Sequence, residues 1–199
     1  IMVEEEEALK HITPDSLLVL VDHHREILTA SKAVLEAISK RIIVDHHRRA
    51  EDLIGDTVLL YLEPSSSSTS ELLTELVGYF NDRLEITPAE ATALYSGIVL
   101  DTKNFAVQTG ERTFEAAALL RRSGADPNMV RLMFKDDMDV LKLRARLIAE
   151  AKTIEPGIAI ALYKRAEKGA KATILAAQVA DTLINIEGIH AYVCTWLRT

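Results

Sequence analysis

Two apolar segments of the chain each lead directly into the same triplet, Asp-His-His. Residues 17–21 precede Asp22-His23-His24, and residues 41–44 precede Asp45-His46-His47. Residues 31–40 lie between them and have a helical pattern, so the region predicts a strand, a helix and a second strand, the form of a parallel βαβ unit. Because both apolar runs are continuous, we expect strands that are covered on both faces.

Further segments extend this pattern to an α/β fold. Ser68 with Glu71 and Thr87 with Glu90 both fit a capping box at the start of a helix, and capping is the simplest purpose of the hydroxyl run at residues 65–70. Further strands are expected at residues 58–62, 157–163 and 189–197, and further helices at 68–80, 91–99, 113–123, 129–151 and 172–186. We therefore expect a domain with a parallel sheet and helices on both faces over residues 1–128, a connecting helix over 129–156, and a smaller, partial α/β domain over 157–199.

Composition and charge narrow the class of protein. With 199 residues, 48% hydrophobic and 27% charged, the chain can bury a core and is typical of soluble globular proteins. Its net charge of −7 argues against broad binding to polymeric nucleic acid, but it allows a small phosphate substrate where a metal ion supplies local positive charge. The single cysteine, Cys194, excludes a disulfide within the chain, which favours a reducing compartment and a core thiol. No apolar run is long enough to span a membrane.

Carboxylate and imidazole side chains gather where the predicted elements end. In open α/β sheets, ligands bind beyond the carboxyl ends of the strands, where both triplets are expected. Asp101 follows residues 96–100, Ser-Gly-Ile-Val-Leu, and we expect it at the same edge of the sheet. One such residue alone is more often a turn former or a cap, but the triplets and Asp101 together favour a metal site. Oxygen and nitrogen ligands suit Mn²⁺ or Mg²⁺ and also admit Fe²⁺, Co²⁺ or Zn²⁺, and a pair of such ions can clamp the oxygens of a phosphoryl displacement.

Several segments resemble the DHH phosphoesterase superfamily. Residues 44–49, Val-Asp-His-His-Arg-Arg, resemble its signature, and longer similarities extend over residues 96–105, 112–117, 121–126 and 178–183. Within the superfamily, these segments are most similar to cyclic-di-AMP phosphodiesterases of the membrane-anchored kind, and the resemblance covers nearly the whole chain. It implies a DHH domain followed by a DHH-associated domain, and hydrolysis of cyclic-di-AMP to linear pApA by metal-activated water. The alternatives are a nanoRNA or phosphoadenosine phosphatase of the same superfamily and a catalytically incomplete nucleotide-binding module.

The resemblance also implies a role for each residue of the site. Asp22 would bridge two metal ions, one of which His46 and Asp101 would also bind. Mn²⁺ is the expected metal, with Mg²⁺, Co²⁺ or Fe²⁺ as alternatives. His47 would face the scissile phosphate, and Asp45 would orient the imidazoles. The candidate substrate contacts are His24, Lys103, Asn104, Phe105 and Arg112. The alternative role is solvation for the charged residues and packing in the core for Phe105.

The chain departs from the family pattern in three respects. His23 stands where the family usually has Thr, and we expect it at the rim of the site rather than on a metal. The family's opening motif, His-x-x-x-Asp-x-Asp, and its glycine-rich segment near the C-terminus have no counterpart between Ile1 and Thr199. We therefore expect a piece of a longer protein, inactive by itself and without membrane contact of its own. The parent is expected to be anchored in a bacterial membrane with this region in the cytoplasm, and the expected partners are a cyclic dinucleotide and, in a homodimer, a second copy of the chain.

Overall fold

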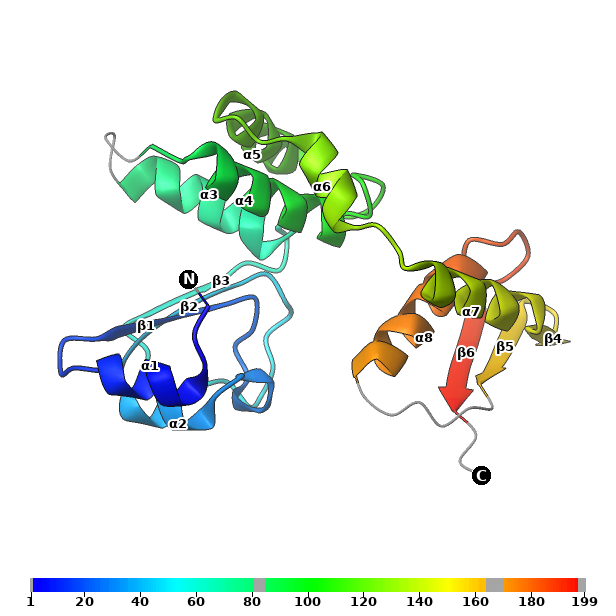
Figure 1. Cartoon of the computed structure of the whole chain (residues 1–199), viewed down its shortest axis with the longest axis horizontal. Coiled ribbons are helices and arrows are strands. Elements are labelled where there is room, and N and C mark those ends of the chain that lie inside the picture. The colour runs from blue at the N-terminus through cyan, green and yellow to red at the C-terminus, as the bar shows by residue number, and fades with distance from the viewer. Residues whose placement is uncertain (1, 81–84, 164–169, 197–199) are drawn as a thin grey trace. The chain divides into compact units, whose positions relative to one another are not determined.

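The computed structural model describes residues 2–80, 85–163 and 170–196. It divides into two units, Ile1–Met133 and Phe134–Thr199, which Figure 1 shows in colours from blue to green and from yellow-green to red. Each unit has a three-stranded sheet and a hydrophobic cluster of its own. The predicted α/β class is therefore confirmed.

A parallel sheet forms the base of the first unit. Its strands, in spatial order, are β1 (Leu17–Val21), β2 (Lys40–Asp45) and β3 (Leu59–Leu62). Val21, the last residue of β1, lies opposite Val44, which is one position before the end of β2. Both Asp-His-His triplets therefore leave the sheet at the same edge, as the βαβ pattern predicts.

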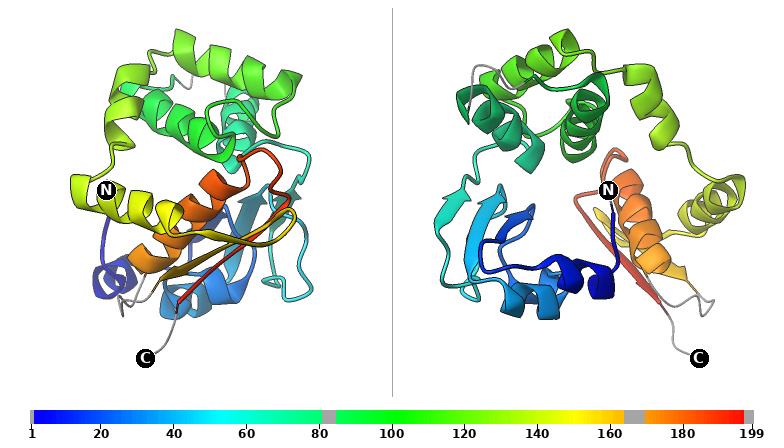
Figure 2. Two further views of the ribbon diagram at one scale, coloured as in Figure 1. Left: turned by 90° about the vertical axis from the view of Figure 1, so that its right-hand side faces the viewer. Right: turned by 60° about the vertical axis from the view of Figure 1, so that its left-hand side comes forward.

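One face of this sheet packs on a short helix, α2 (Lys32–Ala37), which connects β1 to β2. The helix α1 (Glu5–His11) lies against α2, and the two are side by side in both views of Figure 2. The core cluster between sheet and helix consists of Leu20, Leu35, Ile43 and Ile54. On the opposite face, Leu17, Val19 and Val21 remain 42–49% exposed. Within the described part of the chain β1 is therefore covered on one face only, whereas its continuous apolar run predicts cover on both.

Four helices follow β3 and lie on the other side of the sheet from α2 (Figure 1). They are α3 (Thr69–Phe80), α4 (Pro88–Asp101), α5 (Glu111–Arg122) and α6 (Pro127–Met133). The capping box of Thr87 and Glu90 forms as predicted and begins α4. Asp101 is the last residue of α4, so it reaches the site from the end of the helix that the sequence predicts over residues 91–99. Just before it, Ile98 is fully buried in the helical core, whereas Leu100 is 61% exposed.

The second unit is a smaller α/β sandwich. Its elements are α7 (Met138–Ala149), β4 (Lys152–Glu155), β5 (Ile158–Tyr163), α8 (Ala170–Leu183) and β6 (Ala191–Trp196). Strand β5 pairs antiparallel with β4 and parallel with β6, and the cluster around Leu147, Val179 and Leu183 packs against it. Cys194 is half-buried at the margin of this cluster, and burial raises the pKa of its thiol.

The single connecting helix expected over residues 129–156 is wrong. Helix α6 ends at Met133, and Asp137 starts α7 by accepting a hydrogen bond from the N–H of Asp139 at 2.8 Å. The chain then enters β4, whose residues are all exposed. The helix breaks here because the side chain of Asp137 takes the N–H of Asp139, which a continuous helix would use for a hydrogen bond to a carbonyl oxygen of the preceding turn.

Candidate metal centre

Asp22 and His46 meet beyond the ends of β1 and β2. The N–H of Asp22 donates to the carbonyl oxygen of Val44 at 3.0 Å, which extends the pairing of the two strands by one residue. Asp22 then adopts a φ of +66°, a left-handed conformation that turns the chain out of the sheet. In this position Oδ1 of Asp22 lies 3.5 Å from Nε2 of His46.

Asp101 reaches the same point from the end of α4. Its Oδ2 lies 3.9 Å from Nε2 of His46, so this imidazole sits between two carboxylates. Burial and the neighbouring charge of Asp22 raise the pKa of Asp101 above its ordinary value. A bound cation would counteract both effects, because it pairs with the buried carboxylate and screens the two like charges from each other.

The spacing of these atoms suits a shared cation. Ligand atoms that are each about 2.1 Å from an ion lie no more than about 4.2 Å apart. Both distances from Nε2 of His46 fall below that limit. Asp22, His46 and His47 also offer ligand atoms that all lie within 4.8 Å of one another. The described residues therefore contain a candidate metal-binding group of oxygen and nitrogen donors, the donor set that hard and borderline divalent ions prefer.

Asp45 is fully buried and joins two histidines. Its Oδ2 accepts a hydrogen bond from Nδ1 of His24 at 2.5 Å, and its Oδ1 accepts from Nδ1 and N–H of His47 at 2.7 and 3.1 Å. Burial raises the pKa of Asp45, but the hydrogen bonds from His24 and His47 outweigh it and leave the pKa below its ordinary value. Asp45 is therefore a carboxylate at neutral pH, and it holds the ring of His47 with Nε2 free. An orienting role for Asp45 requires this geometry.

The other two histidines of the triplets face the protein. His24 is only 3% exposed, and its Nε2 accepts a hydrogen bond from the N–H of Ala50 at 3.0 Å. Both ring nitrogens of His24 are thus hydrogen-bonded to buried protein groups. This geometry favours support of Asp45 over the predicted contact with substrate. The ring of His23 lies 3.1 Å from the carbonyl oxygen of Val21 and 3.3 Å from the hydroxyl of Thr29. It is held by its own loop, as expected for a residue outside the metal group.

The hydroxyl-rich segment at the start of α3 makes a contact with the site that the sequence did not reveal. Oγ1 of Thr69 donates a 2.9 Å hydrogen bond to Oδ1 of Asp22. The same segment is anchored by Glu71, whose carboxylate accepts from the hydroxyls of Ser66 and Ser67 at 2.8 and 2.5 Å. The signal in the sequence was the run of Ser and Thr at residues 65–70, which capping alone explains. Only the tertiary contact with Asp22 shows that the run also serves the site.

Lys103, Asn104 and Phe105 form an unusual turn directly after Asp101. Their φ angles are +48°, +59° and +62°, a left-handed conformation that costs energy for residues other than glycine. Thr102 holds the turn, because its hydroxyl accepts from the N–H of Phe105 at 2.9 Å and donates to the end of α4. The turn leaves Lys103 and Asn104 exposed beside Asp101, where a bound molecule would meet them.

Two of the predicted substrate residues have protein partners instead. The ring of Phe105 stacks on Phe114, with centroids 5.7 Å apart, and packs against the core of the helical layer. Arg112 forms a two-pronged ion pair with Glu75, with N–O distances of 2.8 and 2.6 Å. The hydrogen bonds and charge of Glu75 raise the pKa of Arg112 further above its ordinary value. A packing role for Phe105 and a structural role for Arg112 are thus the simpler interpretations.

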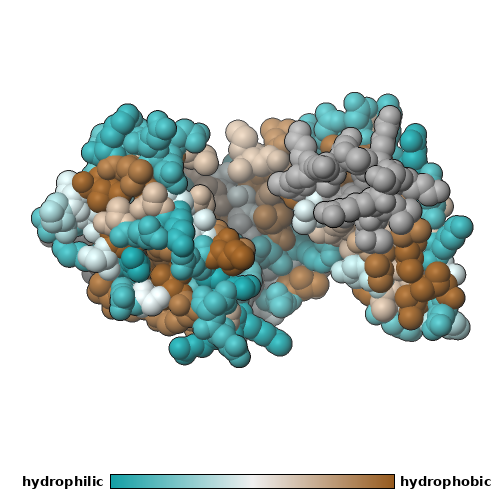
Figure 3. Space-filling view, turned by 90° about the horizontal axis from the view of Figure 1, so that it is seen from below, coloured by the Kyte–Doolittle hydropathy of each residue, from teal (hydrophilic) through white to brown (hydrophobic). Residues whose placement is uncertain are grey.

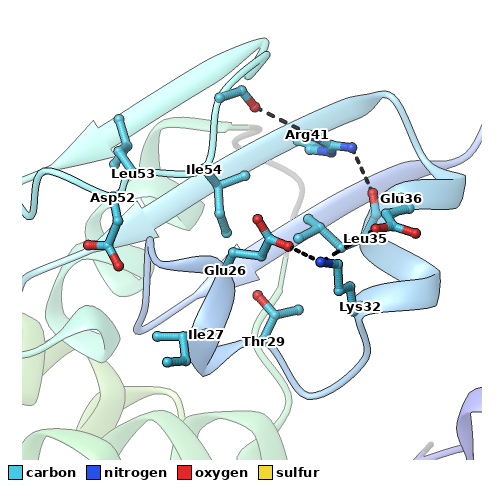
Figure 4. Close-up of a pocket in the computed structure, with 11 residues that line it drawn as sticks. Glu26, Ile27, Thr29, Lys32, Leu35, Glu36, Arg41, Asp52, Leu53 and Ile54 are labelled. Carbon is cyan, nitrogen blue, oxygen red and sulfur yellow. Dashed lines mark hydrogen bonds and ion pairs between the residues drawn. The ribbon is translucent and has the colours of Figure 1, made fainter.

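A hollow of about 770 Å³ in the first unit lies away from this centre, between α2, the short helix η1 (Glu26–Leu28) and residues 52–55 (Figure 4). Lys32 pairs with Glu26 at 2.9 Å, and Arg41 donates to backbone carbonyl oxygens. The side of the unit that carries α1 and α2 shows apolar patches among hydrophilic residues (Figure 3). Because the charged side chains that line this hollow already pair with protein groups, we do not consider it a candidate catalytic site.

The parallel sheet, the strand-end triplets and the group of Asp22, His46 and His47, with Asp101 beside His46, define an α/β protein with a candidate divalent-metal centre. Comparison with known proteins gives the family. Residues 2–98 match the DHH family, N-terminal domain, so this part of the chain belongs to that family. Within the described residues, no helix combines the length and the apolar character that crossing a bilayer requires.

Two curated relatives are similar over almost the whole chain. It is 44% identical over 197 residues to the cyclic-di-AMP phosphodiesterase PdeA of Listeria monocytogenes, covering 99% of the chain and 30% of that protein. It is 41% identical over 189 residues to the cyclic-di-AMP phosphodiesterase GdpP of Bacillus subtilis, covering 95% of the chain and 29% of that protein. The chain thus spans less than a third of the length of either relative.

A solved structure with the same fold is an exopolyphosphatase-related protein from Bacteroides fragilis. Its TM-score is 0.79 at 18% sequence identity, and the match covers 96% of this chain and 58% of that one. At this identity the likeness supports the arrangement of the elements and says nothing of the substrate.

Proposed function

We propose that this chain is the catalytic region of a metal-dependent phosphodiesterase that hydrolyses cyclic-di-AMP to linear pApA. The observation that carries the proposal is the convergence of two carboxylates on one imidazole, at 3.5 and 3.9 Å, from two strands and a helix. The substrate follows from the similarity of 41–44% to curated cyclic-di-AMP phosphodiesterases over nearly the whole chain.

In the proposed centre Asp22, His46 and Asp101 would hold a metal ion, and Asp22 would also serve a second one. Mn²⁺ is the proposed metal, with Mg²⁺, Co²⁺ or Fe²⁺ as alternatives. When bound, such ions activate water at neutral pH and neutralise charge on a phosphate. The side chain of Asp22 suits a bridging position, because it is 57% exposed while Thr69 restrains only one of its oxygens.

His47 is the proposed donor to the scissile phosphate. Asp45 fixes its Nδ1, so the opposite ring nitrogen remains available, and the side chain is 57% exposed. A donor held in place before the reaction stabilises developing charge without reorganisation during it. Lys103 and Asn104, which the strained turn presents beside Asp101, are proposed as further contacts to phosphate or base.

The proposed partner is a small cyclic dinucleotide rather than a nucleic acid polymer. The net charge of −7 provides no broad basic surface, so attraction of phosphate has to come from the metal centre. We also propose a homodimer and a location in the cytoplasm as part of a membrane-anchored protein, on the resemblance alone. Light scattering of the purified protein and fractionation of cells test these two proposals.

A turnover assay tests the proposed activity. The full-length protein with Mn²⁺ is given cyclic-di-AMP, a short linear oligoribonucleotide and phosphoadenosine phosphate in parallel, and products are separated by chromatography. Preferred conversion of cyclic-di-AMP to pApA, lost in Asp101→Asn, supports the proposal. Preference for either linear substrate would replace it with a nanoRNA or phosphoadenosine phosphatase, and binding without turnover would indicate a nucleotide-binding module.

A further inference from the structure

We propose that His24 is a positioning residue that sets the geometry of His47 through Asp45. The inference rests on the proposed function and extends it to a side chain that touches neither the candidate metal group nor the solvent. His24 belongs to the first triplet, but both of its ring nitrogens bond to residues of the second triplet's segment. One triplet therefore supports the other.

The hydrogen bonds of His24 determine its tautomer. The backbone N–H of Ala50 can only donate, so Nε2 of His24, 3.0 Å away, must present its lone pair. The ring hydrogen is then on Nδ1, where it is donated to Oδ2 of Asp45 at 2.5 Å. The ring of His24 therefore donates in one direction and accepts in the other.

These two bonds bracket the segment that carries the site's histidines. Asp45 is the last residue of β2 and Ala50 lies five positions further, so His24 fixes both ends of an irregular segment that contains His46 and His47. His24 is itself anchored, because its carbonyl oxygen accepts from the N–H of Ile54 at 2.9 Å. Residues 46–49 form no helix or strand, so their shape depends on side-chain hydrogen bonds such as these.

The link to His47 runs through opposite oxygens of one carboxylate. Oδ2 of Asp45 receives His24, and Oδ1 receives Nδ1 of His47 at 2.7 Å. Without His24, the fully buried Asp45 would lose the only side-chain donor that the structure gives to Oδ2 within the described residues. A buried carboxylate in that state recruits other donors by rotating, and rotation would carry His47 with it.

The test compares amide replacements that keep one bond each. Asn places its NH₂ group near the position of Nδ1, so His24→Asn retains a donor to Asp45. Gln places its amide near Nε2, so His24→Gln retains only the bond to Ala50. We expect His24→Gln to lower kcat roughly 10–100-fold with KM nearly unchanged, and His24→Asn to recover most of that loss. His23→Gln, next to it in the chain and outside the network, is the matched control and should leave kcat unchanged.

A double-mutant cycle separates positioning from general loss of structure. If His24 acts through His47, His24→Gln in a His47→Ala background lowers kcat no further. Equal losses in both backgrounds, or no loss in the single variant, overturn the proposal. Thermal unfolding of each variant with Mg²⁺ shows whether it is folded, and if His24→Gln is not, His24→Asn against His24→Ala provides the same comparison.

An experiment that needs no turnover keeps this inference distinct from the proposed function. In the full-length protein labelled with ¹⁵N-histidine, NMR should show His24 as the tautomer with hydrogen on Nδ1 and a lone pair on Nε2. That result supports the positioning role of His24 even if cyclic-di-AMP is not hydrolysed, in which case only the proposed function fails. Hydrogen on Nε2 would contradict the bond from Ala50 and overturn the inference.

Discussion

The hydroxyl of Thr69 lies 2.9 Å from Oδ1 of Asp22 and donates a hydrogen bond to it across 47 positions of sequence. Thr69 is 4% exposed, whereas the side chain of Asp22 is 57% exposed, so a buried donor restrains an exposed carboxylate. Such a restraint would favour metal binding by Asp22, because less conformational freedom is lost when an ion binds.

Thr69→Val should therefore weaken metal binding without unfolding the protein. Val has nearly the same shape as Thr but has no hydroxyl, so Asp22 loses its donor while packing is kept. We expect the affinity for Mn²⁺ to fall roughly 10–100-fold, as is typical when a partner of a metal ligand is removed. Isothermal calorimetry measures the change, and Thr69→Ser, which keeps the hydroxyl, is the control. Equal affinities for Thr69→Val and the unmodified protein would show that Asp22 needs no support from α3.

Glu71 should stabilise the fold through its charge. Burial raises the pKa of Glu71, but hydrogen bonds from Ser67, Thr113 and Ser66 outweigh it, so the pKa lies below its ordinary value. A lowered pKa means that the folded state prefers the carboxylate. The resulting stability is present above the ordinary pKa of about 4.3 and is lost as the pH falls through the lower folded value.

Glu71→Gln is expected to reduce the free energy of unfolding by about 1–3 kcal/mol at pH 7, because a buried donor loses its charged acceptor. The difference in the free energy of unfolding between the variant and the unmodified protein should become smaller in acid, where Glu71 itself becomes protonated. Urea unfolding at pH 7 and near pH 3.5 measures both effects, with the exposed Glu115→Gln as control. If this difference in free energy stays constant with pH, Glu71 stabilises the fold through its hydrogen-bond geometry rather than through its charge.

Much of the site follows from the pattern of the strands. Continuous apolar runs that end in Asp22 and Asp45 predict parallel strands, and parallel strands bring their carboxyl ends to one edge. The register of β1 against β2 has this form. The same local reasoning places the capping box at Thr87, because a cap depends on residues that are close in sequence.

Residues that act through distant contacts could not be predicted in this way. Thr69 and Ser68 have the same local pattern, yet only Thr69 reaches Asp22, and that depends on how α3 packs on β2. His24 and His47 also look equivalent in sequence, although one is buried and the other exposed.

The contact between α3 and α4 should depend on Gly97. A Cβ at this position would overlap with Oγ of Ser70 and would lie 3.0 Å from Cβ of Ser70, so the Ser70 side chain would have to shift. Gly97→Ala is therefore expected to lower the free energy of unfolding by about 1–3 kcal/mol, the usual cost of overpacking. Gly78→Ala in α3 is the matched control, because its Cβ would meet nothing within 4 Å, and it should stabilise the helix by up to ~1 kcal/mol. If both variants unfold at the same urea concentration, the two helices are not in close contact at Gly97.

His47 and Asp101 should separate metal binding from chemistry. Asp101 lies 3.9 Å from Nε2 of His46 and is placed to bind the ion, so Asp101→Asn should lose both Mn²⁺ affinity and activity, because an amide replaces a charged ligand. His47 is turned towards solvent with Nδ1 on Asp45, so His47→Ala should keep its Mn²⁺ and lose roughly 100–1,000-fold in rate, the usual effect of removing a donor aimed at developing charge. Calorimetric titration with Mn²⁺, beside kcat for cyclic-di-AMP, measures both properties for each variant. If His47→Ala loses metal in proportion to its activity, His47 is itself a ligand, and the group of Asp22, His46 and His47 within 4.8 Å is then the more accurate description of the site.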